Sequence, residues 1–251
     1  MTTRILLLTL AGAGALALAA CGKQEETTTG AVASLCTPSA APAAPQNGDW
    51  TTVVTQTAEC GFRMGNPDAP VKLIEYGSMT CPHCREFDEQ ALKPLLENYV
   101  KTGRVSFEFR NFVRDQFDLT ASLIARCGGT ERFFPLTSGL FADQPNWMNR
   151  IQAADQQQLQ SVSNLPPNQM FVELAKVTGF QQWAAQRGLP SATTSACLAN
   201  ETEVNKLVQM QSDAVSTFNV PGTPAFVING ELVKDSANWA SLEPKLKEAL
   251  N

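Results

Sequence analysis

Two cysteines separated by two residues, Cys81 and Cys84, constrain this chain more than any other feature. The apolar segment before them, residues 71–76, predicts a short buried strand, and residues 85–100 predict a helix. Cysteines at this spacing can close a small disulfide that exchanges readily, and a strand-to-helix turn places the first sulfur at the start of the helix. The sequence therefore predicts thiol–disulfide exchange, with Cys81 as the reactive sulfur.

Length and composition set the class of protein. The chain has 251 residues, 43% of them hydrophobic, which suits one large domain or a domain with a substantial insertion. Its formal net charge of −5 gives no indication of a nucleic-acid partner. Beyond the N-terminus we find no apolar run long enough to predict a membrane span.

The first twenty residues have the pattern of an export signal. Arg4 precedes the apolar stretch 5–20, which stops at Cys21. Residues 18–21 resemble the bacterial lipobox, which implies acylation of Cys21 and anchoring to a membrane. Gly22 follows, where some lipoproteins carry an aspartate that retains them in the inner membrane, so outer-membrane attachment is expected. An ordinary secretory signal is the alternative.

Six cysteines remain besides Cys21, an even number that suits three disulfides in an oxidising compartment. Six cysteines allow 15 pairings, and only the Cys81–Cys84 pair follows from proximity. Cys36 falls in a segment poor in large apolar side chains, which predicts a flexible tether with a reach of about 30 Å. The sequence leaves the partner of Cys36 open, and a bond to Cys60 would pin this tether to the domain.

The periodicity of apolar residues predicts mixed α/β structure. Strands are expected at 51–57, 71–77, 104–112, 225–228 and 231–233, and helices at 82–100, with a break near Pro94, and at 237–250. Between them, four amphipathic helices are predicted, the last with Val204, Leu207, Val208 and Val215 on its apolar stripe. The predicted organisation is a signal peptide at 1–20, a tether at 21–48, a folded domain at 49–114 and 217–251, and a helical insertion at 115–216.

Two further features combine with the CPHC stretch of residues 81–84 and the helix that begins there. Glu75 is an acid in an otherwise apolar strand, and Thr223-Pro224 stands immediately before the strand 225–228. Over about residues 60–250 this pattern resembles the DsbA-like thiol–disulfide oxidoreductases of the thioredoxin superfamily. The resemblance implies an α/β thioredoxin fold with an inserted α-helical domain, and an enzyme that needs no cofactor.

The resemblance also assigns roles. Cys81 is the nucleophile, favoured as a thiolate by the helix N-terminus and by His83, while Pro82 restricts the turn. Cys84 is the buried partner sulfur. Glu75 lies beneath Cys84 and handles its proton, with a pKa raised by desolvation. A surface position for Glu75 on an edge strand is the alternative.

Thr223 and Pro224 are expected to form a cis-proline loop beside the disulfide, where the backbone of Thr223 pairs with an extended substrate. A plain turn before a strand is the alternative. A zinc site needs about four ligands. His83 is the only histidine and a second CxxC is absent from the sequence, so no metal is expected.

The resemblance further implies a structural disulfide between Cys127 and Cys197, and leaves Cys36 and Cys60 for the third pair. It implies a periplasmic, monomeric oxidase for reduced exported proteins, reoxidised by a DsbB-like membrane quinone reductase. Because Thr223 is typical of the isomerase and reductase branches, a reductase or isomerase is one alternative. A peptide-binding or chaperone lipoprotein, with purely structural cysteines, is another.

Overall fold

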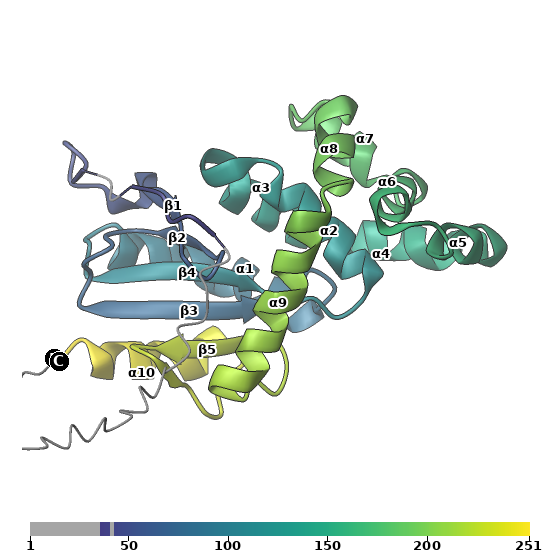
Figure 1. Cartoon of the computed structure of the whole chain (residues 1–251). Coiled ribbons are helices and arrows are strands. Elements are labelled where there is room, and N and C mark those ends of the chain that lie inside the picture. The colour runs from purple at the N-terminus through teal and green to yellow at the C-terminus, as the bar shows by residue number, and fades with distance from the viewer. Residues whose placement is uncertain (1–35, 41–42) are drawn as a thin grey trace, which may run out of the picture. The chain divides into compact units, whose positions relative to one another are not determined.

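A mixed sheet forms the centre of the molecule. The structure is a computed structural model that describes residues 36–40 and 43–251. Across these residues the sheet has six strands in the order β1-β2-β4-β3-β5-β6 (Figure 1). The strands are β1 (Val54–Gln56), β2 (Phe62–Met64), β3 (Val71–Gly77), β4 (Val105–Asn111), β5 (Ala225–Ile228) and β6 (Glu231–Leu232). Strands β3 and β4 are parallel, and each of the other pairs is antiparallel.

The helices account for most of the remaining chain. A short 3-10 turn, η1 (Trp50–Thr52), precedes the sheet, and α1 (Pro82–Leu95) follows β3. Past Pro94, the helix changes to a π-type turn, η2 (Leu96–Val100), because proline cannot donate the backbone hydrogen bond of a regular helix. The helix is therefore not interrupted at Pro94, and the irregularity predicted there takes the form of this change in hydrogen-bond pattern. The closing helix α10 (Trp239–Ala249) begins after the β5–β6 hairpin.

The two faces of the sheet have different cover. Leu73 of β3 and Phe107 of β4 belong to the main apolar core, which also contains buried residues of α1 and Leu242 and Leu246 of α10. On the opposite face α9 (Glu201–Phe218) crosses the sheet (Figure 1), and Tyr76 of β3 packs there. The alternation of side chains along β3 thus directs odd-numbered residues toward α1 and even-numbered ones toward α9.

The insertion contains more helices, and shorter ones, than the sequence indicated. Seven helices precede α9 in it: α2 (Gln116–Arg126), α3 (Gly129–Ala142), α4 (Gln144–Ala153), α5 (Gln156–Ser163), α6 (Pro167–Val177), α7 (Phe180–Gln186) and α8 (Ser191–Leu198). The four predicted helices are present as α2, α3, α6 and α9, while α4, α5, α7 and α8 were not predicted, because short helices hold too few apolar residues to show a clear period.

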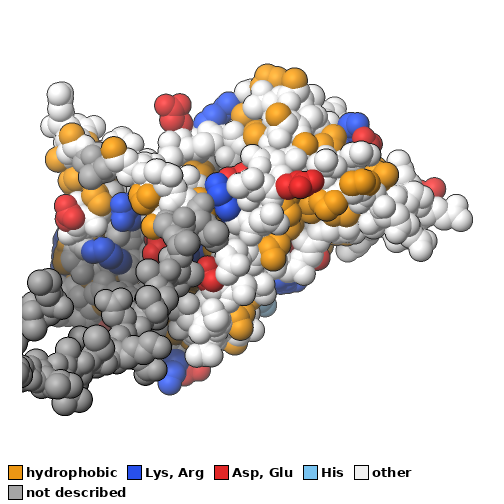
Figure 2. Space-filling view, viewed as in Figure 1, with side chains coloured by type: hydrophobic (Ala, Val, Ile, Leu, Met, Phe, Trp, Pro, Cys, Tyr) orange, Lys and Arg blue, Asp and Glu red, His pale blue; other side chains and the backbone are white. Residues whose placement is uncertain are grey.

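The apolar stripe predicted for the last insertion helix was also partly wrong. The buried residues of α9 are Leu207, Met210 and Ala214, while Val208 is 49% exposed and Val215 is 44% exposed. Apolar side chains are visible on the face of the molecule where α9 crosses the sheet (Figure 2). The helix therefore buries a face rotated from the predicted one.

The compact unit starts earlier than predicted. It includes residues 36–40, whereas the sequence placed the end of the tether at residue 48. Cys36 is 4% exposed and bonded to Cys60, and Ser39 donates its backbone N–H to Gln56 of β1 at 3.1 Å. The predicted signal peptide, the lipidation site Cys21 and most of the tether lie outside the described residues.

A second disulfide joins Cys127, which follows α2, to Cys197 in α8. Both disulfides have the pairing expected from the sequence, and Cys81 and Cys84 are present as free thiols. The strand β2 was not predicted, since its three residues are too few to show alternation. Within residues 36–40 and 43–251, the helices lack the combined length and apolar character needed to cross a bilayer.

Candidate active site

Cys81 occupies the N-cap position of α1, and Pro82 is the first residue inside the helix. Proline suits this position because its missing N–H has no acceptor in the first turn. The sulfur of Cys81 donates to the backbone oxygen of Thr223 at 3.2 Å, and the residue is only 2% exposed. The turn thus presents Cys81 where several backbone N–H groups of the helix lack partners.

The surroundings of Cys81 favour its thiolate. A hydrogen bond from the Cys84 thiol lowers the pKa of Cys81 most, and burial opposes this effect. Hydrogen bonds from Thr223 and from the backbone of Cys84 and His83 act in the same direction as the Cys84 thiol, and the pKa falls to about 5. The Thr223 hydroxyl is buried without another partner, so it is available to donate to a thiolate.

Cys84 has the opposite electrostatic character. It is fully buried, and burial raises its thiol pKa well above the usual value, with the Cys81 hydrogen bond and the charge of Glu75 adding to the effect. The backbone N–H of Ser78 donates to its sulfur at 3.5 Å. One helical turn therefore holds a stabilised thiolate and a stabilised thiol side by side.

Glu75 lies in the central strand β3 and is 3% exposed, so the alternative of a surface position on an edge strand was wrong. Its Oε1 is buried without a hydrogen-bond partner. Burial raises the pKa of Glu75 well above its usual value, and the negative charges of Asp88 and Cys81 raise it further. Burial therefore favours the protonated form of this carboxyl, close to the buried sulfur that needs a proton.

Sequence reasoning missed a second acid near this site. Asp88 lies one turn after Cys84 in α1, and its carboxylate accepts a hydrogen bond from Ser138 of α3 at 2.9 Å. Burial raises the pKa of Asp88 to about 6. The spacing of four residues from Cys84 was the available signal, since residues i and i+4 share a helix face.

His83 has a smaller part in the site than the sequence suggested. Its side chain is 68% exposed, and its Nδ1 lies 3.0 Å from Oε2 of Glu86, which raises the pKa of the imidazole. The contribution of His83 to the Cys81 thiolate includes its backbone N–H. Pro82 is exposed beside it.

Two residues of the insertion, also missed from the sequence, hold the turn before the cysteines. Asp118 of α2 accepts from the hydroxyl of Ser78 at 2.5 Å and from the backbone N–H of Met79 at 2.8 Å. Gln144, the first residue of α4, donates its side-chain amide to the oxygens of Met79 at 2.7 Å and Cys81 at 3.0 Å. The insertion therefore contacts the active-site turn directly.

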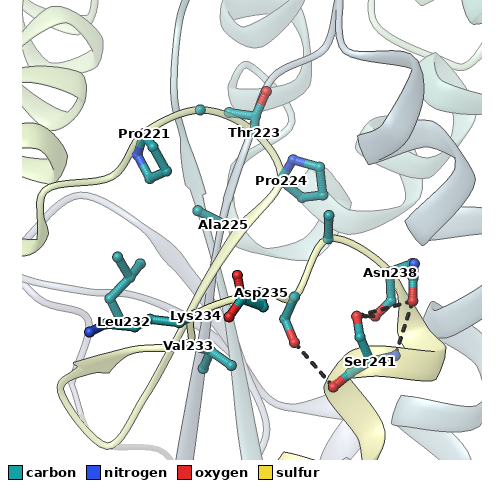
Figure 3. Close-up of a pocket in the computed structure, with 13 residues that line it drawn as sticks. Pro221, Thr223, Pro224, Ala225, Leu232, Val233, Lys234, Asp235, Asn238 and Ser241 are labelled. Atoms are coloured by element: carbon teal, nitrogen blue, oxygen red, sulfur yellow. Dashed lines mark hydrogen bonds between the residues drawn. The ribbon is translucent and has the colours of Figure 1, made fainter.

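A groove of about 660 Å³ lies beside Thr223-Pro224, whose peptide bond is cis. Figure 3 shows Pro221, Thr223 and Pro224 along one side, with Leu232 to Asp235 and the start of α10 along the other. At that start, Asn238 accepts from the backbone N–H of Ser241 at 3.0 Å. The groove is open to an extended chain, and it adjoins the residue that contacts Cys81.

Comparisons with known proteins agree with this fold and site. A family model described as Thioredoxin matches residues 57–248. The crystal structure of a protein-disulfide isomerase from Novosphingobium aromaticivorans is 35% identical, with a TM-score of 0.72 over 75% of this chain and 96% of that chain. The structure of Wolbachia pipientis alpha-DsbA1, at 22% identity and a TM-score of 0.60, covers 75% of this chain and 89% of that one, and shares the fold.

Curated sequences give a similar picture. A Rickettsia bellii protein named as a protein-disulfide oxidoreductase is 26% identical over 192 residues, which are 75% of this chain and 65% of that protein. Disulfide bond formation protein D of Bacillus subtilis is 24% identical over 198 residues, which are 74% of this chain and 76% of that protein. The chain spans between about half and two thirds of the length of the Rickettsia relatives.

Proposed function

This chain belongs to the thioredoxin family, within its DsbA-like group, and we propose that it is a protein thiol–disulfide oxidoreductase that introduces disulfides into exported proteins. The observation that carries the proposal is the opposite character of two neighbouring sulfurs, a Cys81 thiol with a pKa of about 5 and a Cys84 thiol with a raised pKa. A stabilised thiolate favours the reduced pair, which makes the disulfide an oxidant.

The reaction begins with the oxidised pair. A substrate thiolate attacks the sulfur of Cys81, the Cys81–Cys84 bond breaks, and a mixed disulfide forms between substrate and Cys81. Cys84 leaves with the electron pair and takes a proton, which the buried carboxyl of Glu75 can supply. The oxygen of Thr223 and the adjoining groove offer an extended substrate a place to pair beside Cys81.

A second substrate thiolate completes the exchange. It attacks the substrate sulfur of the mixed disulfide and releases Cys81 as a thiolate. The substrate loses two electrons and gains a disulfide, and the enzyme pair gains those electrons. We propose that a DsbB-like membrane quinone reductase then reoxidises Cys81–Cys84, because continued turnover needs an electron acceptor.

The decisive measurement is the reduction potential of the Cys81–Cys84 pair in glutathione buffers, with mass analysis of trapped thiols. An oxidase is expected to have a potential of about −120 to −180 mV, whereas a value of about −270 mV would indicate a reductase.

Isomerisation is the second candidate, favoured by the name of the Novosphingobium structure. A substrate with scrambled disulfides separates the two activities. An isomerase restores native pairing without an added oxidant, whereas an oxidase acts on reduced substrate and consumes oxidant.

We also propose that the chain is exported and anchored by acylation of Cys21, as a monomer at the outer membrane facing the periplasm. The support is the apolar stretch 5–20 ending in the LAAC sequence. Labelling with radioactive fatty acid is expected to mark the wild-type chain but not Cys21→Ala. Mass analysis that finds Cys21 unmodified or removed would exclude the anchor.

A further inference from the structure

The turn that leads into Cys81 is held from outside the thioredoxin core. Residues 78–81 connect β3 to α1, and Met79 is buried in the main apolar core. Four hydrogen bonds link this turn to Asp118 of α2 and Gln144 of α4. Two helices of the insertion therefore restrain the peptide groups next to the reactive sulfur.

Gln144 makes the contact nearest to Cys81. Its side chain is almost fully buried, with 4% exposed, and its amide nitrogen donates to two carbonyl oxygens at once. The Cys81 oxygen also accepts from Arg85 in the first turn of α1 at 3.3 Å, so Gln144 supplies its shorter hydrogen bond. A buried amide that pairs both of its donors in this way is restricted to one orientation.

We propose that Gln144 is a positioning residue for Cys81. By holding the carbonyl groups of Met79 and Cys81, it fixes the peptide plane at the start of α1 and so keeps the N–H groups of His83 and Cys84 directed at the sulfur of Cys81. This inference rests on the proposed function, since it concerns the same sulfur.

Electrostatics add to the geometry. The donor end of the Gln144 amide lies 3.0 Å from the Cys81 oxygen, so the positive end of its dipole lies at the peptide group of the residue that carries the thiolate. In a buried site this dipole acts strongly, because the local dielectric is low. Losing this donor is therefore expected to disfavour the thiolate.

Asp118 restrains the other end of the turn. It orders Ser78 and Met79, and the Ser78 N–H is the group that donates to the sulfur of Cys84. It also accepts from the backbone N–H of Arg114 at 3.0 Å, so one carboxylate ties the start of α2 to the turn. The insertion thereby restrains the donors around both sulfurs.

The test uses the substitution Gln144→Met, which keeps the length of the side chain and removes the donor. The readouts are the pH dependence of Cys81 alkylation and the reduction potential of the pair. The pKa of Cys81 is expected to rise by about one unit, a tenfold change that corresponds to a potential about 30 mV more negative.

Gln181→Met is the matched control. Gln181 is also a buried glutamine of the insertion, 8% exposed, and its amide donates to Ser195 at 2.8 Å, away from the active-site turn. It is expected to lose similar stability while keeping the wild-type alkylation profile and potential. If Gln144→Met matches Gln181→Met in both readouts, Gln144 is merely structural and the inference is wrong.

Gln144→Glu is the second test variant, to be used if Gln144→Met does not fold. It keeps the shape of the side chain and replaces the two donors by a group that accepts when ionised, so the pKa of Cys81 is again expected to rise. An unchanged profile in this variant would overturn the inference. The reduction potential of the wild-type chain tests the proposed function separately. The differences in Cys81 pKa and in potential between variants can be measured whether the enzyme oxidises or reduces its substrates.

Discussion

The Cys81–Cys84 turn and the Cys36–Cys60 disulfide are equally buried, and yet their chemistry differs. Each of the four residues is at most 4% exposed. Cys36 and Cys60 pack with Met210, and Arg126 donates to the oxygen of Cys60 at 3.0 Å. Cys81 instead caps a helix, contacts Thr223 and has Glu75 beneath its partner sulfur. Burial alone therefore does not make a cysteine reactive; the donors directed at the sulfur do.

Removing Cys81 is the strongest way to break this comparison. Cys81→Ser is expected to abolish oxidation of a dithiol peptide, because serine cannot form the mixed disulfide. Replacing Cys36 and Cys60 together by serine is expected to leave the rate of thiol–disulfide exchange at Cys81–Cys84 close to that of the wild type. The measurement is fluorescence of a dithiol peptide as it closes. Full activity of Cys81→Ser in this assay would show that Cys81 is not the attacking sulfur, whereas full complementation of a deletion by Cys81→Ser would point to a peptide-binding role.

Removing the structural disulfides tests the comparison by measuring the free energy of unfolding. In the chain-entropy picture, a crosslink over 70 residues contributes about 4.4 kcal/mol and one over 24 residues about 3.5 kcal/mol. Replacing both cysteines of each pair by serine is expected to lower the free energy of unfolding by up to these amounts in urea titrations. The reduction potential of Cys81–Cys84 is expected to stay unchanged, and a large shift would show that the disulfides are coupled to the site.

Glu75→Gln tests the proton supply beneath Cys84. Loss of a proton donor at this point is expected to slow exchange by on the order of 10²-fold in stopped-flow measurements. Glu248→Gln, on the exposed surface of α10, is the control. Equal rates in the two variants would show that Glu75 does not carry the proton.

Glu75→Gln is also expected to change the free energy of unfolding, in a direction that follows from the pKa shift of Glu75. In the unfolded chain the carboxyl of Glu75 ionises near the ordinary glutamate pKa of 4.5, while in the folded protein it remains protonated to higher pH. The contribution of Glu75 to stability is therefore lost as pH rises above about 4.5, up to its folded pKa. Glu75→Gln is expected to be more stable than the wild type at pH 7, with a weaker fall of stability with pH in urea titrations.

His83→Ala is expected to have the smallest effect. Its imidazole is 68% exposed and pairs with Glu86, so solvent weakens its attraction for the Cys81 thiolate. The pKa of Cys81 is expected to rise by less than about half a unit, since the backbone N–H remains. Alkylation of Cys81 as a function of pH measures this, and a shift of a full unit would mean that the side chain acts directly on the sulfur.

The sequence was informative where the relevant residues are neighbours in the chain. Cys81, Pro82 and Cys84 occupy one helical start, and Glu75 stood out as an acid in an apolar strand, while its place beneath Cys84 came from the family resemblance. Asn229-Gly230, between β5 and β6, suits a two-residue hairpin turn, and both residues have positive φ in the structure. Val208 and Val215 show the limit of this reasoning. Periodicity predicted the helix correctly, but it did not predict which face of the helix other elements would cover.

Local sequence determined the reactive dithiol, the helix that activates it and the acid in the strand beneath it, since these follow from hydrogen-bond geometry and period within a few turns of chain. Only the tertiary structure decided what surrounds them. Gln144 reaches Cys81 across 63 residues and Asp118 reaches Met79 across 39. Thr223 meets Cys81 across 142 residues. No local period encodes contacts of this range, because they depend on how the insertion and the last strands pack against the first half of the sheet.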